Sequence, residues 1–192
     1  INGAISYRQL CNAMRLGKLG QQFVEYDILL QYLTLENSLS QYELYSEPLG
    51  ISSGAHCQMP ILLSEYDFNC KEDIDMYFKI LSDLPGYFDG IMRFEAAKAD
   101  AGLFMSDSLC VDVINQCEDF ESSDLLIDSF ANRVNELDSL SDSEKTDYIE
   151  ENNAIVSDLI MPAYTRLASD LTALLGRGRN SLGLYYAVKG CD

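Results

Sequence analysis

The chain has 192 residues, of which 31 are acidic and 13 are basic, so its formal net charge is −18. A surface with this excess of carboxylates repels nucleic-acid phosphates and anionic membranes, which argues against both as partners. Hydrophobic residues make up 47% of the chain, which excludes a disordered protein and is sufficient for a buried core. No apolar run reaches the roughly 18 residues that a transmembrane helix needs, so we expect no membrane-spanning segment.

Helical periodicity dominates the sequence and predicts an all-α fold, an irregular multi-helix bundle that forms one domain over residues 1–192. Apolar stripes, N-cap residues and C-cap glycines such as Gly102 place the helices along the chain. The expected helices cover residues 6–17, 21–41, 61–66, 71–84, 86–101, 108–120, 122–137 and 142–175, with a loop from Tyr42 to His56.

Prolines and capping signals set the expected helix ends. Pro60 is predicted to lie near the first turn of the helix at 61–66, and Pro85 to begin a separate helix. Pro162 is predicted to kink or break the long helix, because proline has no amide hydrogen. Capping boxes are expected at Asn69–Glu72 and at Ser141–Glu144. The glycine-rich, aromatic tail at 176–192 predicts a loop or a short hairpin.

Residues that could carry chemistry are few. His56 is the only histidine, and no nucleophile or metal-ligand set can be recognised around it, so we expect a surface or loop-anchoring role. The six cysteines include no CxxC pair, and Cys110 and Cys117 have the spacing of buried residues on one helix. The sequence therefore predicts no catalytic residue, no metal site and no bound cofactor within this chain.

Three carboxylates lie in or near the apolar helices. Glu65, Glu95 and Asp100 are expected to form helix-surface salt bridges with Arg93 and Lys98 rather than to converge as an acid–base pair. Glu95 differs from the other two because its spacing places it on the core-facing stripe of its helix. A carboxylate in that position requires a partner.

Four segments of the sequence resemble a known family. They are EPLGISSGAHCQMPILLSEYDF (47–68), YFDGIMRFEAAKADAGLFMSD (87–107), IMPAYTRL (160–167) and GLYYAVKGCD (183–192). From about Leu29 to Asp192, the chain is similar to the amino-terminal part of a bacterial all-helical family, domain of unknown function 885. The resemblance implies a zinc peptidase in which two histidines and a glutamate hold the metal and a second glutamate is the general base. None of these four residues can be placed in this chain, so zinc is expected only in a full-length parent protein.

Two functions remain open on these grounds. One is the noncatalytic scaffold portion of a zinc-dependent, carboxypeptidase-like protein, whose partners are its own carboxy-terminal half and a peptide substrate. The other is a helical binding or structural module without enzymatic activity. For the first, loop character makes His56, Gln58, Tyr185 and Tyr186 the substrate-groove candidates. An uncovered groove wall exposes apolar surface, which predicts a homo-oligomer. The resemblance favours an extracytoplasmic or cell-surface location, with the cytoplasm as the alternative.

Overall fold

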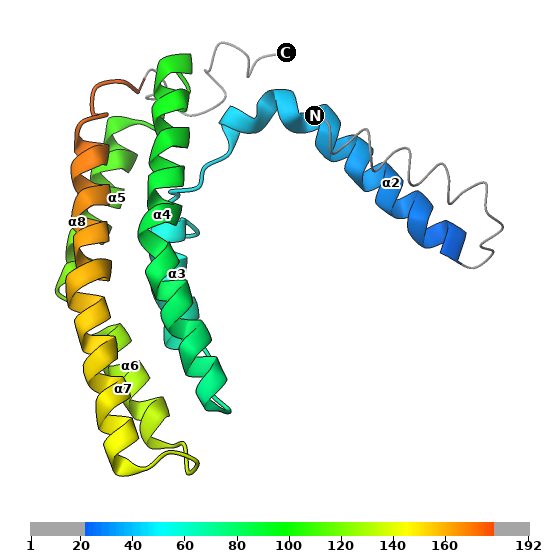
Figure 1. Ribbon diagram of the computed structural model, residues 1–192. Coiled ribbons are helices and arrows are strands. Elements are labelled where there is room, and N and C mark those ends of the chain that lie inside the picture. The colour runs from blue at the N-terminus through cyan, green and yellow to red at the C-terminus, as the bar shows by residue number, and fades with distance from the viewer. Residues whose placement is uncertain (1–21, 179–192) are drawn as a thin grey trace. The chain divides into compact units, whose positions relative to one another are not determined.

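The computed structural model describes residues 22–178, of which 22–26 and 41 are described by their backbone alone (Figure 1). Within this range all regular secondary structure is helical and there is no β-strand, which confirms the predicted all-α multi-helix fold. The chain divides into two compact units, Ile1–Ser46 and Glu47–Asp192. Between residues 22 and 178, no helix combines the length and the hydrophobicity that crossing a membrane requires.

In the first unit, α2 (Gln22–Leu39) continues into the 3₁₀ helix η1 (Ser40–Tyr45). The sequence predicted one helix over 21–41, so the helical part extends four residues further into the expected loop. The hydroxyls of Ser38 and Ser40 donate to the carbonyls of Leu35 and Asn37, and such bonds satisfy backbone groups at a helix end. The helix predicted at 6–17 lies outside the described residues.

The second unit contains α3 (Ala55–Ser64), α4 (Lys71–Ala101), α5 (Asp107–Glu121), α6 (Leu125–Asn135), α7 (Asp142–Ile155), the π-helical segment η2 (Val156–Ile160) and α8 (Met161–Thr172). In Figure 1, α4 lies beside a rod formed by α7, η2 and α8. The ion pairs Lys71–Glu144 and Asp89–Arg166 join α4 to this rod, and Asp100–Arg177 joins α4 to the turn after α8. The three pairs follow the same order along both parts. An exposed ion pair contributes about 0–1 kcal/mol, so their main effect is to define a parallel register.

Helix α4 runs unbroken for 31 residues through Pro85, so the prediction that Pro85 begins a separate helix was wrong. An interior proline costs a helix about 3 kcal/mol. Buried side chains on both sides of it offset that cost, because Leu81, Leu84, Phe88 and Ile91 are all at most 7% exposed and each contributes about 1.5–3 kcal/mol.

The start of α4 also differs from the prediction. The N-cap is Cys70, and the carboxylate of Asp73, rather than that of Glu72, accepts the backbone N–H groups of Asn69 and Cys70 at 2.8 and 3.2 Å. The predicted end is confirmed, since Gly102 adopts a left-handed φ of 75° there. This conformation favours glycine, which has no Cβ.

The helix that follows residue 141 begins as predicted and does not break at Pro162. The Ser141 hydroxyl accepts the N–H of Glu144, whose carboxylate accepts the N–H of Ser141. The contacts with Lys71 and Ser141 lower the pKa of Glu144 to about 2. The π-helical segment η2 directly precedes Pro162. A π turn shifts the hydrogen-bond register by one residue, which accommodates a residue without an amide hydrogen.

Helix α6 begins later than the sequence suggested. Its N-cap is Asp124 and its first residue is Leu125, whereas the predicted start was at 122. The aromatic ring of Phe130 on this helix lies within 5.5 Å of the rings of Phe68, Tyr77 and Phe78. This cluster packs α6 against α4 at one end of the unit.

Helix α3 begins at Ala55, six residues before the predicted start, so Pro60 lies inside it. The carbonyl that would accept an N–H from position 60 is that of His56, and proline has none to donate. Tyr164 of α8 donates its hydroxyl to this carbonyl at 2.8 Å. At the other end, Arg133 of α6 donates to the carbonyls of Leu63 and Tyr66 at 3.2 and 2.7 Å. Helix α3 is therefore held at its first turn by α8 and at its last turn by α6.

The loop before α3 depends on a glycine. A Cβ atom at Gly54 would lie 2.4 Å from the carbonyl oxygen of Gly50 and 2.7 Å from the His56 ring, whereas one at Gly50 would meet nothing closer than 3.8 Å. We therefore expect Gly54→Ala to lower the free energy of unfolding by about 1–3 kcal/mol. Gly50→Ala is the matched control and is expected to change it by less than about 1 kcal/mol. Urea denaturation measures both, and equal effects of the two substitutions would contradict the close approach at Gly54.

Candidate functional site

His56 and Gln58 lie in the first turns of α3 rather than in a loop. His56 is 2% exposed, and its Nε2 lies 2.8 Å from the Oε1 atom of Gln116 on α5. Gln116 in turn donates its side-chain N–H to the carbonyl of Ile51 at 3.1 Å. His56 is thus buried, which corrects the expected surface position, and its contact with Gln116 bears out the loop-anchoring role.

A cysteine beside His56 raises the question of a nucleophile. The Sγ atom of Cys57 lies 3.1 Å from His56 Nε2 and 3.3 Å from Gln116 Oε1. Because the amide nitrogen of Gln116 donates to Ile51, its Oε1 is oriented to accept a hydrogen bond from the imidazole. The imidazole proton then resides on Nε2, and this nitrogen cannot take a proton from the thiol.

Burial reinforces this assignment. It lowers the pKa of His56, with a smaller opposing effect from Gln116, and it raises the pKa of the Cys57 thiol. A neutral imidazole beside a protonated thiol is not an activated cysteine pair. The cluster of His56, Cys57 and Gln116 therefore joins α3, α5 and the preceding loop, which is a structural role.

Of the four substrate-groove candidates, two are described. Gln58 is half-buried and donates to the carbonyl of Ser52 at 3.3 Å, and His56 has the contacts given above. Neither lines the groove between α4 and α8 that is described below. Tyr185 and Tyr186, like most of the tail predicted at 176–192, lie outside the described residues, so their role as candidates stays a prediction.

The core holds an unexpected group of charges. Glu95 and Lys98 are both completely buried, so the predicted helix-surface salt bridge between them is instead internal. The Lys98 ammonium lies 2.8 Å from an oxygen of Glu47 and 3.6 Å from one of Glu95. The core-facing position predicted for Glu95 is confirmed. The ion pair with Lys98 thereby joins Glu47, the first residue of the second unit, to α4.

Glu95 is the least satisfied member of this group. Neither of its carboxylate oxygens has a hydrogen-bond partner among the described residues. Burial raises its pKa to about 7, and the proximity of Glu47 adds to the effect while Lys98 opposes it. Removing a carboxylate from water disfavours its charged form, so Glu95 is mainly protonated in the folded protein below about pH 7.

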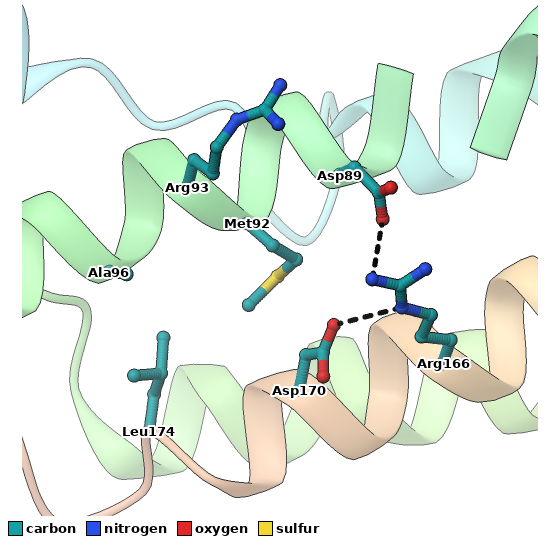
Figure 2. A pocket seen from close by; sticks show the side chains of 7 residues that line it. All are labelled: Asp89, Met92, Arg93, Ala96, Arg166, Asp170 and Leu174. Carbon is teal, nitrogen blue, oxygen red and sulfur yellow. Dashed lines mark ion pairs between the residues drawn. The ribbon is translucent and has the colours of Figure 1, made fainter. Parts of the chain in front are cut away.

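A groove lies between α4 and α8 (Figure 2). Its volume is about 340 Å³, and it is lined by Asp89, Met92, Arg93, Ala96, Arg166, Asp170 and Leu174. This volume lies within the range of about 300–1,000 Å³ that ligand sites occupy. The groove is therefore large enough to hold a small ligand or part of a peptide.

Charged groups lie along one edge of the groove and apolar groups form its floor. Arg166 lies 3.2 Å from Asp89 and 3.7 Å from Asp170, so its guanidinium is held between two carboxylates. Figure 2 shows Met92 and Leu174 extending toward the space between the helices, while Arg93 extends away from it. The groove can provide apolar contacts and a fixed set of charges to a ligand.

The described residues do not fit a zinc ion. Over 22–178, no three histidine, cysteine, aspartate or glutamate side chains come together in an arrangement that could hold a metal. The zinc implied by the sequence resemblance therefore has no ligand set in this part of the chain.

The sequence alone did not single out several residues of these sites. Tyr164, Gln116 and Arg166 all lie on predicted helices next to apolar stripe positions. The usable signal is Pro60, because a proline inside a helix leaves the carbonyl four residues earlier without its amide donor, and a buried carbonyl needs another one. Which donor does so depends on tertiary contacts between helices that are far apart in sequence.

Comparison with known proteins places the chain in a family. Residues 6–186 match the family described as bacterial protein of unknown function, DUF885. The fold is similar to the crystal structure of the "putative lipoprotein" from Colwellia psychrerythraea, with a TM-score of 0.71 and 19% sequence identity. The similarity covers 75% of this chain and 26% of that one, so this chain spans about a quarter of the length of that protein. At this identity the likeness shows a shared fold alone. No curated protein matches the chain.

The buried carboxylate predicts a pH dependence of stability. The pKa of Glu95 rises from 4.5 to about 7 on folding, so between these values the folded protein retains a proton that the unfolded chain has lost. The free energy of unfolding should then fall as pH rises from about 4.5 to about 7, by up to about 3 kcal/mol. Glu95→Gln should remove this part of the pH dependence.

Urea denaturation of both proteins at pH 5 and pH 8 measures the effect. Glu65→Gln is the matched control, because it removes the same charge from an exposed position on the same unit. An identical pH dependence in the wild type and in Glu95→Gln would show that Glu95 does not titrate as described.

Proposed function

Because the chain belongs to the DUF885 family, we propose that it is the noncatalytic helical scaffold portion of a zinc-dependent, carboxypeptidase-like protein. In this proposal, the groove between α4 and α8 forms one wall of a peptide-binding site. The remaining carboxy-terminal half of the same protein supplies the metal ligands and the general base.

The observation that carries the proposal is the chemistry of the groove. An extended peptide presents apolar side chains together with polar backbone groups. Met92, Ala96 and Leu174 offer apolar surface to the former, while Asp89 and Arg166 offer an acceptor and a donor to the latter. The ion pairs between α4 and the α7–η2–α8 rod hold both walls of the groove in one register.

The size and the fold of the chain support a scaffold role. The structure with which it shares a fold is about three times as long, since 75% of this chain matches 26% of that one. In this proposal, the metal site lies in the part of the larger fold that this chain does not match. The name of that structure, a lipoprotein, also supports the extracytoplasmic or cell-surface location that we propose for this chain.

Peptide binding to the groove is the test. The probe is a fluorescein-labelled octapeptide of alternating leucine and serine, titrated with the full 192-residue chain by fluorescence anisotropy. We expect Met92→Glu to weaken binding at least about tenfold, because a charge in the apolar floor loses hydration when the peptide covers it. Met76→Glu makes the same change at an exposed position of the same helix and should alter binding less than about twofold.

The same peptide tests whether this chain only binds the substrate while the carboxy-terminal half provides the catalytic groups. We expect no hydrolysis by this chain, with or without added zinc, and metal-dependent hydrolysis by the full-length parent protein. Zinc-dependent cleavage by this chain alone would contradict the scaffold proposal. An absence of peptide binding, or equal binding by the two methionine variants, would favour a helical module that does not act as a groove wall.

A further inference from the structure

Helix α2 carries an apolar stripe that the described residues leave uncovered. Ile28, Tyr32, Leu35, Leu39 and Tyr42 follow each other at alternating spacings of four and three residues. Their exposed fractions lie between 46% and 63%. Spacings of this kind place side chains on one face of a helix and are the pattern with which one helix packs along another.

Acidic side chains accompany this stripe. Glu36 and Glu43 each follow a stripe residue directly and are seven residues apart, which places both along the same side of it. No lysine or arginine occurs anywhere between Lys18 and Lys71. Over the described residues 22–46, the surface around the stripe is therefore negative and carries no lysine or arginine.

A hollow at the carboxyl end of the stripe brings these groups together. Its volume is about 640 Å³, and Glu36, Leu39, Tyr42, Glu43 and Tyr45 line it. The Tyr45 hydroxyl is buried there and has no hydrogen-bond partner in the described part of the chain. The hollow itself brings two carboxylates and apolar side chains together at the surface, whereas the Tyr45 hydroxyl is too enclosed for a ligand to reach.

We propose that α2 and η1 form the docking surface for a cationic amphipathic helix of a partner protein. The heptad-like spacing selects a helix, because its apolar side chains fit between those of the stripe. Glu36 and Glu43 select lysine or arginine on the flanks of that helix. A second copy of the chain is disfavoured, because its own α2 carries carboxylates and no cations, and like charges across an interface repel. This inference does not depend on the peptidase proposal.

The test uses two synthetic peptides and the full chain. Both peptides have leucine at the heptad core positions, one with lysine and one with glutamate at the flanking positions, and both carry fluorescein. We expect the lysine peptide to bind at least about tenfold more tightly than the glutamate peptide. Leu35→Ser combined with Leu39→Ser should weaken binding of the lysine peptide at least about tenfold.

Matched controls distinguish binding at the stripe from a general electrostatic attraction of the lysine peptide to a chain of net charge −18. Leu62→Ser changes a leucine of similar exposure on α3 and should leave the affinity within about twofold. Glu36→Gln with Glu43→Gln should weaken binding and reduce its salt dependence more than Glu118→Gln with Glu121→Gln, which removes the same charge elsewhere. Three results would each overturn the proposal. The first is an equal effect of the two glutamate pairs, and the second is unchanged binding of the lysine peptide by the leucine double variant. The third is a dimer of the chain in light scattering that Leu35→Ser with Leu39→Ser dissociates.

Discussion

The hydrogen bond from the Tyr164 hydroxyl to the His56 carbonyl is the interaction on which the arrangement of the second unit depends. Pro60 removes the amide that would otherwise satisfy this carbonyl within α3, and α8 supplies the donor at 2.8 Å instead. The same turn of α3 binds α5 through His56 and Gln116. A short helix that would be marginal by itself thereby becomes the element that ties the loop at 47–54 to two longer helices.

This constraint also explains why the single histidine and its neighbouring cysteine are not a reactive pair. His56 is oriented by Gln116 and enclosed by the close approach of Gly54. These contacts at the start of α3 fix the position of the imidazole, and its burial lowers the pKa of His56. The groove to which we assign peptide binding lies elsewhere in the unit, between α4 and α8, where Arg166 forms ion pairs with Asp89 and Asp170 beside apolar side chains.

How far the sequence predicts this structure depends on the range of the interactions involved. Local signals predicted the fold class, the capping box at Ser141 and the helix end at Gly102, because each involves residues within a few positions of one another. The same local signals predict helix starts near Pro60 and at Pro85, yet both prolines lie inside helices. Tertiary burial and a donor from a distant helix offset the local penalty, and neither can be read from neighbouring residues. The burial of Lys98 beside Glu95 and Glu47 was missed for the same reason, since Glu47 is 51 positions away.

The coupling between Pro60 and Tyr164 tests the central claim most directly. Tyr164→Phe should lower the free energy of unfolding by about 1–3 kcal/mol in the wild type, because the His56 carbonyl is left buried without a donor. In a Pro60→Ala background, the alanine amide can donate to that carbonyl, so the loss should shrink by at least about 1 kcal/mol. Urea denaturation of the four proteins of this double-mutant cycle gives the coupling free energy. An equal loss in both backgrounds would show that Tyr164 does not replace the hydrogen bond that Pro60 removes.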